Sequence, residues 1–197
     1  MRYYIADCHF GHEKAMQLDK RPFDTVEQMD AYMIEQWNQV VRKKKDEVVI
    51  LGDFCMGKGE RVNELLSALN GRKCLVTGNH DSMFLRDKRF DTDLFEWIRP
   101  YAELHDNNRK VVLSHYPIIC YNGQYHGKMT YMLYGHVHDT QDYWNVQRFV
   151  RETRETTYGE EKKPISCNML NCFAVFSDYR PLTLDEWITL EQKKTFA

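Results

Sequence analysis

Five short apolar runs in this chain end abruptly at polar or small residues. Their near-continuous apolar character predicts buried strands at residues 2–6, 48–51, 74–77, 110–113 and 131–134. Each run leads directly into a turn that carries Asp, Asn or His. Because open α/β sheets place their sites at the carboxyl ends of strands, the repeated pattern predicts one polar cluster at a sheet edge.

Two stretches between the first three runs show helical spacing. Apolar residues recur at three- and four-residue steps over residues 26–40, and Thr25 with Gln28 forms a capping box before them. A second apolar stripe covers residues 62–69 and stops before Gly71. The resulting order of strand, helix, strand, helix, strand predicts parallel pairing through crossover helices.

In the middle of the chain, the spacing of the apolar runs predicts shorter connections between strands. A short helix is expected over residues 82–90. Strands are expected over 98–104, 109–115 and 129–135, and the brief segments between them predict a second, more antiparallel sheet.

The last third of the chain does not continue this alternation of short apolar runs and turns. Residues 139–164 are rich in charge and predict a solvated helix or an ordered loop, with a partner-binding element as the alternative. A strand is expected near residues 173–176. Thr183 with Glu186 predicts a capped final helix that turns Trp187 inward.

Length and composition predict an ordinary globular protein. A chain of 197 residues can bury a sizeable core, so a single domain over 1–197 is expected. The net charge of -2 provides no global basic field for long nucleic acid. No apolar run approaches the roughly 18 residues of a membrane span, and the first strand begins too early for a signal peptide. Six cysteines without CxxC spacing predict a reduced, cytoplasmic protein without structural disulfides.

The polar turns form an ordered series of motifs: Asp7-x-His9, Gly52-Asp53, Gly78-Asn79-His80-Asp81, the isolated His115, and Gly135-His136-x-His138. Each is a common string by itself, but five in order, each after a predicted strand, are specific. The series resembles the calcineurin-like metallophosphoesterases. The longer run Asp7-Cys8-His9-Phe10-Gly11-His12 is similar to a small prokaryotic and phage branch of predicted phosphoesterases. The resemblance implies an α/β fold in which two sheets form a sandwich flanked by helices, an α/β/β/α arrangement.

The resemblance also implies a centre of two metal ions. Its ligand positions fall on Asp7, His9 and His138 for the first ion, on Asn79, His115 and His136 for the second, and on Asp53 as the bridge. A carboxylate suits a bridge because it has two oxygens and a charge. The mixture of oxygen and imidazole donors favours Mn, Fe, Zn or Ni over Ca or Mg.

The local spacing agrees with such a centre. In an extended segment residues i and i+2 point to one side, so Asp7 and His9 are expected to face the same pole with Cys8 turned away. The Cys8 thiol would make the site sensitive to oxidation if it were exposed. A glycine before a ligand lets the chain turn sharply and approach the ions.

Further roles follow from the same resemblance. His80 is expected beside the leaving group as a catalytic residue, and Asp81 or a backbone carbonyl is expected to fix its tautomer. Substrate-binding candidates are Asn79, His12, Arg21 and His126, where Arg21 would clamp a phosphate.

These residues predict a metal-dependent phosphoesterase that hydrolyses a phosphate ester by attack of a metal-bound hydroxide, with a phosphodiester slightly favoured. A small phosphorylated substrate is the expected partner, with nucleotides among the candidates. Membrane association and stable nucleic-acid binding are not expected. The alternatives are a phosphomonoesterase or nuclease of the same superfamily, or a non-catalytic metal-binding interaction module.

Overall fold

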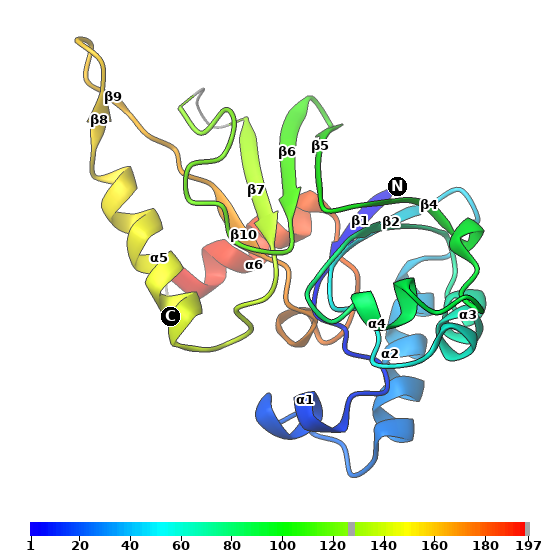
Figure 1. The fold of residues 1–197 in the computed structure, drawn as a ribbon. Coiled ribbons are helices and arrows are strands. Elements are labelled where there is room, and N and C mark those ends of the chain that lie inside the picture. The colour runs from blue at the N-terminus through cyan, green and yellow to red at the C-terminus, as the bar shows by residue number, and fades with distance from the viewer. Residues whose placement is uncertain (126–128, 196–197) are drawn as a thin grey trace.

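A computed structural model describes residues 1–125 and 129–195 (Figure 1). The first half builds a parallel sheet in the order β1 (Arg2–Ile5), β2 (Glu47–Leu51), β3 (Arg72–Val76) and β4 (Phe95–Arg99). Its connections carry α1 (Glu13–Leu18), α2 (Val26–Val40), α3 (Gly59–Ala68), α4 (Ser82–Leu85) and the 3-10 helix η1 (Thr92–Leu94). The predicted parallel pairing through crossover helices is therefore confirmed.

The start and buried face of α2 follow the sequence pattern. Thr25 accepts a hydrogen bond from the backbone N–H of Gln28 (3.2 Å), which satisfies one of the free donors at the helix start. The apolar stripe is buried as far as Trp37, whose indole N–H donates to the Asn70 carbonyl (3.0 Å). This bond joins α2 to the turn that follows α3.

The second sheet has the order β10-β7-β6-β5. It contains β5 (Tyr101–Asp106), β6 (Arg109–Ser114), β7 (Thr130–Tyr134) and β10 (Met169–Asn171). Only β5 and β6 are antiparallel, while the β6–β7 and β7–β10 pairs are parallel. The second sheet is thus more antiparallel than the first, as expected, although only one of its three strand pairs is antiparallel. The connection between β6 and β7 has no helix in its described residues 115–125 and 129, yet it is long enough to bring the chain back to the starting edge.

The strand predicted over 98–104 is divided between the two sheets. β4 pairs with β3 in the first sheet and β5 pairs with β6 in the second, and Pro100 lies between them. Proline has no backbone N–H to give to a ladder, so it marks the point at which the chain can leave one sheet for the other.

Three apolar clusters define the layers of the molecule. One lies between the two sheets and includes Tyr4, Val49, Leu113 and Leu133. A second packs α2 and α3 against the outer face of the first sheet. A third packs α5 (Gln141–Arg154) against the outer face of the second sheet. The expected α/β/β/α sandwich is confirmed (Figure 1).

The final strand lies earlier than expected. β10 ends at Asn171, and residues 174–177 form the 3-10 helix η2 (Ala174–Ser177) in place of the strand predicted near 173–176. Here the chain crosses to the first sheet: Ala6 N–H donates to the Cys172 carbonyl (2.7 Å), and Ala174 N–H donates to the Ala6 carbonyl (2.9 Å). These two bonds close one side of the sandwich.

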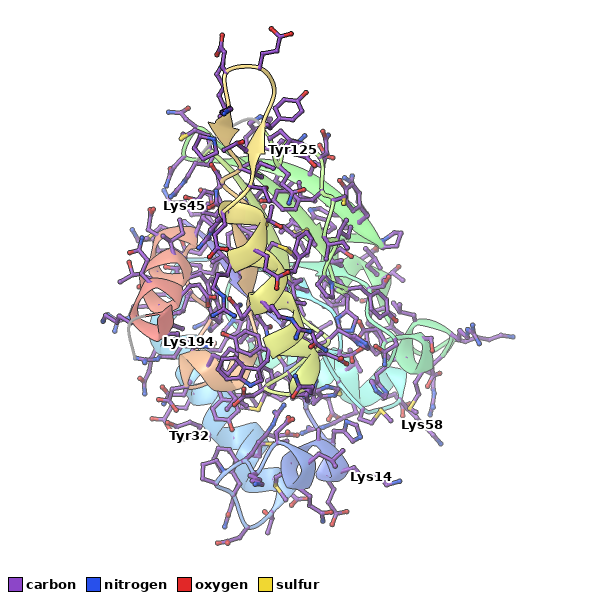
Figure 2. All side chains as sticks on the ribbon, turned by 90° about the vertical axis from the view of Figure 1, so that its left-hand side faces the viewer. Lys14, Tyr32, Lys45, Lys58, Tyr125 and Lys194 are labelled. Atoms are coloured by element: carbon purple, nitrogen blue, oxygen red, sulfur yellow. The ribbon has the colours of Figure 1, made fainter. Side chains whose placement is uncertain are left out.

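Helices and a hairpin complete the chain. The helix predicted within 139–164 is α5, and a hairpin of β8 (Thr157–Tyr158) and β9 (Lys163–Pro164) projects beyond it (Figure 2). The last helix, α6 (Leu184–Thr195), follows the predicted capping box of Thr183 and Glu186. No helix in the described ranges is long and apolar enough to cross a membrane.

Candidate metal centre

All seven predicted ligands lie on turns at the carboxyl ends of strands. In the first sheet Asp7 and His9 follow β1, Asp53 follows β2 and Asn79 follows β3. In the second sheet His115 follows β6, and His136 and His138 follow β7. The arrowheads of β6 and β7 in Figure 1 point toward the edge where these turns meet. The strand-end pattern in the sequence therefore located the cluster.

Three of these residues form a first group. One side-chain donor atom from each of Asp7, His9 and His138 lies within 4.8 Å of the other two. His9 Nε2 lies 3.2 Å from His138 Nε2, and His138 Nε2 lies 3.6 Å from Asp7 Oδ1. These are the three residues expected to hold the first ion.

The second group surrounds Asn79. Its Oδ1 lies 3.0 Å from His115 Nε2 and 3.0 Å from His136 Nδ1, so the three expected ligands of the second ion meet. Asp53 Oδ2 lies 3.5 Å from His115 Nε2 and 3.7 Å from His9 Nε2. The Asp53 carboxylate thus stands between the two groups.

Hydrogen bonds on the far side of two imidazoles determine where their lone pairs point. His115 Nδ1 donates to the Leu51 carbonyl (2.8 Å), and this bond turns Nε2 toward Asn79 Oδ1 and Asp53 Oδ2. His138 Nδ1 faces Asp19 Oδ1 (2.7 Å) in the same way. The atoms that face one another here are imidazole nitrogens and carboxylate or amide oxygens, which are metal-ligand types, so the donor set fits a metal ion.

Charge around His138 supports this fit. Burial alone would lower the pKa of His138, but its hydrogen bonds to Asp19 and Asp7 raise it to about 9. The field of these carboxylates therefore favours positive charge at this position. Burial, with a contribution from His138, holds the pKa of His9 far below its usual range, so His9 is a neutral imidazole with a free lone pair.

The backbone at the ligands is unusual. Asp7, His9, Asp53, His136 and His138 have φ values of 53°, 52°, 52°, 69° and 45°. Non-glycine residues in this left-handed region carry strain of about 1–3 kcal/mol and cluster at functional sites. The expectation that the i and i+2 ligands converge because the segment is extended was therefore wrong. The paired ligands converge because the backbone adopts a left-handed φ at each of them.

The glycines before the ligands make room for ligand side chains. A Cβ at Gly135 would lie 2.5 Å from Asp7 Oδ2, and a Cβ at Gly52, where φ is +86°, would overlap the His115 ring. One at Gly78 would overlap the carboxylate that stands between the groups. These positions are glycine mainly because a Cβ would clash with a neighbouring ligand side chain, and less because the backbone must turn sharply there.

Arg21 does not reach the surface as the expected phosphate clamp. Its side chain is buried and donates to the backbone carbonyls of Cys8 (2.7 Å) and Asp7 (3.1 Å) and to Asp19 Oδ2 (2.9 Å). It therefore fixes the strained turn around Asp7. Asp19, which the sequence reasoning missed, connects Arg21 with His138. A single carboxylate ten residues after the first motif gives no signal of its own in the sequence.

Asp81 has a different role from the one expected. Its carboxylate is fully buried and accepts the backbone N–H groups of Asp53 (3.0 Å), Phe54 (2.9 Å) and Gly78 (2.7 Å). Burial raises its pKa to about 6, although the backbone hydrogen bonds act in the opposite direction. Both oxygens are used, so Asp81 joins the turns after β2 and β3 and does not orient the His80 ring.

His80 lies at the open side of the centre. Its side chain is 39% exposed, and its Nε2 is 4.0 Å from Asp53 Oδ2. Its backbone N–H donates to Asp53 Oδ1 (2.8 Å). The ring therefore faces the solvent beside the Asp53 carboxylate, where a leaving group could reach it.

The remaining candidates differ in position. His12 Nδ1 lies 3.0 Å from His9 Nδ1, so His12 belongs to the centre. His126 lies outside the described residues. The Cys8 thiol is fully buried with its pKa raised by that burial, which removes the reason to expect sensitivity to oxidation.

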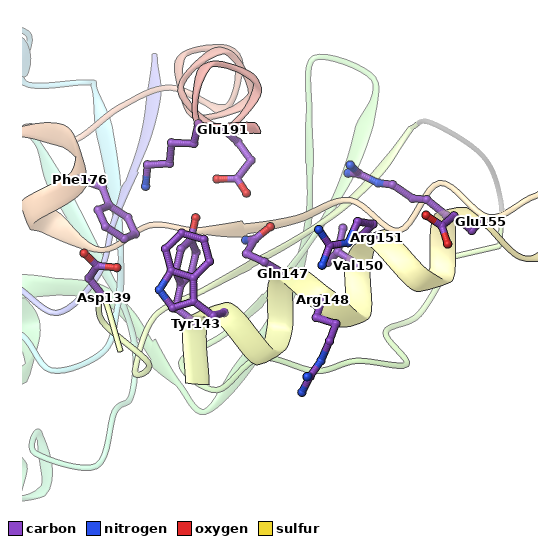
Figure 3. Close-up of a pocket in the computed structure, with 12 residues that line it drawn as sticks. Asp139, Tyr143, Gln147, Arg148, Val150, Arg151, Glu155, Phe176 and Glu191 are labelled. Atoms are coloured by element: carbon purple, nitrogen blue, oxygen red, sulfur yellow. The ribbon is translucent and has the colours of Figure 1, made fainter. Parts of the chain in front are cut away.

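A cavity of about 710 Å³ lies between α5 and α6 (Figure 3). Tyr143 and Gln147 line it from α5, Glu191 from α6, and Phe176 from η2. None of the lining residues is a predicted ligand. The cavity is therefore separate from the metal centre.

Comparisons with known proteins agree with the geometry. Residues 3–186 match the calcineurin-like phosphoesterase family. An uncharacterized protein of Methanocaldococcus jannaschii is 28% identical over 193 residues, which cover 97% of this chain and 91% of that protein. The crystal structure of a protein of unknown function from Aquifex aeolicus superposes with a TM-score of 0.63 at 25% identity, covering 96% of this chain and 98% of that one. The chain belongs to the calcineurin-like phosphoesterase family.

Proposed function

We propose that this protein is a dinuclear-metal-dependent phosphoesterase that hydrolyses phosphodiesters. The observation that carries the proposal is that two groups of ligand-type side chains meet on the two sides of Asp53. A single structural ion would need one such group. Two adjoining groups with a carboxylate between them are what a two-metal hydrolytic site requires.

Asp7, His9, His138 and Asp53 would hold one ion, and Asp53, Asn79, His115 and His136 would hold the other. When bound, the ions would neutralise phosphoryl oxygens and lower the pKa of a water molecule. The imidazole-rich set suits Mn, Fe, Zn or Ni.

The protein itself supplies orientation and a proton. The His80 backbone N–H occupies Asp53 Oδ1, which leaves Oδ2 directed between the two groups. The exposed His80 ring is placed to give a proton to the departing oxygen. An ester with an alkoxide leaving group needs this proton most, and this need favours a diester of a nucleoside or alkyl alcohol as the substrate.

The test is hydrolysis of bis(4-nitrophenyl) phosphate by chelator-treated protein after reconstitution. Mn²⁺ should restore activity and Ca²⁺ should not, because Ca²⁺ prefers oxygen ligands. Asp53→Asn should bind less metal and lose hydrolysis, because an amide offers one neutral oxygen. Turnover with Ca²⁺ alone or without metal would contradict the proposal. So would an Asp53→Asn protein with two ions per chain and normal turnover.

A further inference from the structure

The turn that follows the first motif brings a fifth imidazole against a metal ligand. His12 N–H donates to the His9 carbonyl (3.2 Å), which closes a four-residue turn, and Gly11 at its third position has a φ of +70°. The turn folds the His12 ring back, so that Nδ1 of His12 lies 3.0 Å from Nδ1 of His9.

This turn is held from outside. Gly11 N–H donates to Asp30 Oδ1 (2.9 Å), and Asp30 Oδ2 pairs with Arg61 (3.0 Å). Asp30 is buried on α2 and so fixes the turn to the helix layer. The contact between His12 and His9 is therefore preset by the scaffold and does not depend on a mobile side chain.

The position of the protons follows from the ligand geometry. His9 Nε2 faces His138 Nε2 (3.2 Å) and Asp53 Oδ2 (3.7 Å), so His9 Nε2 is the atom that would hold a metal ion at this group. The proton of a neutral His9 then lies on Nδ1, and the only role left for His12 Nδ1 is to accept it. His115 and His138 use a carbonyl and a carboxylate for the same purpose.

We propose that His12 is a positioning residue that fixes the metal-binding tautomer of His9 and, through its own Nε2–H, binds a phosphoryl oxygen of the substrate. A carbonyl or a carboxylate in its place could accept from His9 but could not donate onward. The His12 ring is half-buried, with its centroid 5.6 Å from that of His80, so both imidazoles border the same open side of the centre. The second part of this inference rests on the proposed function, whereas the first part does not.

Two substitutions separate the roles. His12→Phe removes both the acceptor and the donor, while His12→Gln retains an oxygen acceptor and an N–H donor. Loss of a hydrogen-bond partner behind a ligand costs about 10–100-fold in metal affinity. Mn²⁺ affinity, measured by chelator competition, should fall by this factor in His12→Phe and stay near the unmodified value in His12→Gln. His105→Phe is the matched control, because His105 is exposed on β5, which runs antiparallel to β6 and ends at the edge away from the centre.

A spectroscopic measurement tests the tautomers without any substitution. In the Zn²⁺-loaded protein, imidazole ¹⁵N chemical shifts should show protonated Nδ1 on His9 and protonated Nε2 on His12. A proton on His12 Nδ1, or an unchanged Mn²⁺ affinity in folded His12→Phe, would overturn the positioning role. This measurement still decides the matter if His12→Phe fails to fold.

Binding of inorganic phosphate to the Zn²⁺-loaded protein tests the second role. One hydrogen bond to a charged oxygen corresponds to about a tenfold or larger change in affinity. Phosphate should bind more weakly to His12→Phe than to His12→Gln, compared at saturating metal, and equal affinities would overturn the donor role. None of these measurements needs turnover, so a protein that passes them and hydrolyses no ester would contradict only the proposed function.

Discussion

Asp81→Asn distinguishes a structural role of this carboxylate from a role in orienting His80. The three partners of Asp81 are all backbone N–H donors, from Asp53, Phe54 and Gly78. An asparagine has one acceptor oxygen and an NH₂ group that cannot accept. Every orientation of the amide therefore places a donor against at least one buried N–H.

The magnitude follows from counting these bonds. Oδ2 accepts from Asp53 and Gly78, and Oδ1 accepts from Phe54. The better orientation keeps the oxygen at the Oδ2 position and loses the bond from Phe54. A hydrogen bond to a charged group contributes about 1.5–3 kcal/mol, so the free energy of unfolding should fall by about that amount. For a chain of this length, the melting temperature should fall by about 3–12 °C.

The assay is thermal and urea unfolding at pH 8, where Asp81, with its pKa of about 6, is ionised in the folded protein. Asp91→Asn is the control, because Asp91 is an exposed capping residue that asparagine replaces well. Unchanged stability in Asp81→Asn, with hydrolysis lost and metal content retained, would refute the reasoning. That result would return Asp81 to a role in orienting His80.

Two further substitutions test other parts of the centre. Arg21→Met should lower the free energy of unfolding by about 3–5 kcal/mol, because it removes one partner of a buried ion pair with Asp19, whereas the exposed Arg86→Met should change it by at most about 0.5 kcal/mol in urea unfolding. His80→Ala should keep both metal ions and lose about 10²–10⁴-fold in kcat/KM on a nucleoside or alkyl ester, but much less on a nitrophenyl ester whose leaving group departs unprotonated. Equal losses on the two esters would remove the role of His80 as an acid.

The sequence predicted where the candidate ligands lie because the information is local. An apolar run specifies a buried strand, and the residue after it must lie at the sheet edge, so Asp7, Asp53 and His115 could be placed without knowing the rest of the fold. The parallel pairing of the first three strands followed for the same reason, since each crossover helix was visible as a helical spacing of apolar residues.

The parts that the sequence did not reveal depend on contacts between distant residues. Arg21 looked available for a substrate, but its guanidinium is enclosed by the carbonyls of Cys8 and Asp7 and by Asp19. The left-handed φ angles at Asp7 and His9 could not be predicted from the sequence, because neither residue is a glycine. The division of 98–104 between two sheets was marked by Pro100, whose meaning depends on which strands neighbour it.

Three of the candidate ligands also connect the two sheets through hydrogen bonds. Apolar burial between the sheets is non-directional and does not fix the relative position of strand ends to the accuracy that a metal site needs. Two directional bonds supply this: His136 N–H donates to the Asp7 carboxylate (3.0 Å to each oxygen), and His115 Nδ1 donates to the Leu51 carbonyl (2.8 Å). Each bond crosses from one sheet to the other. The donors, His115 Nδ1 and the His136 backbone N–H, do not face the ligand groups, whereas the acceptor Asp7 uses the same carboxylate that belongs to the first group. A substitution at one ligand therefore changes both the charge at the centre and the position of a ligand on the opposite sheet. Because these two effects are coupled, losses measured for single-ligand variants are not expected to add.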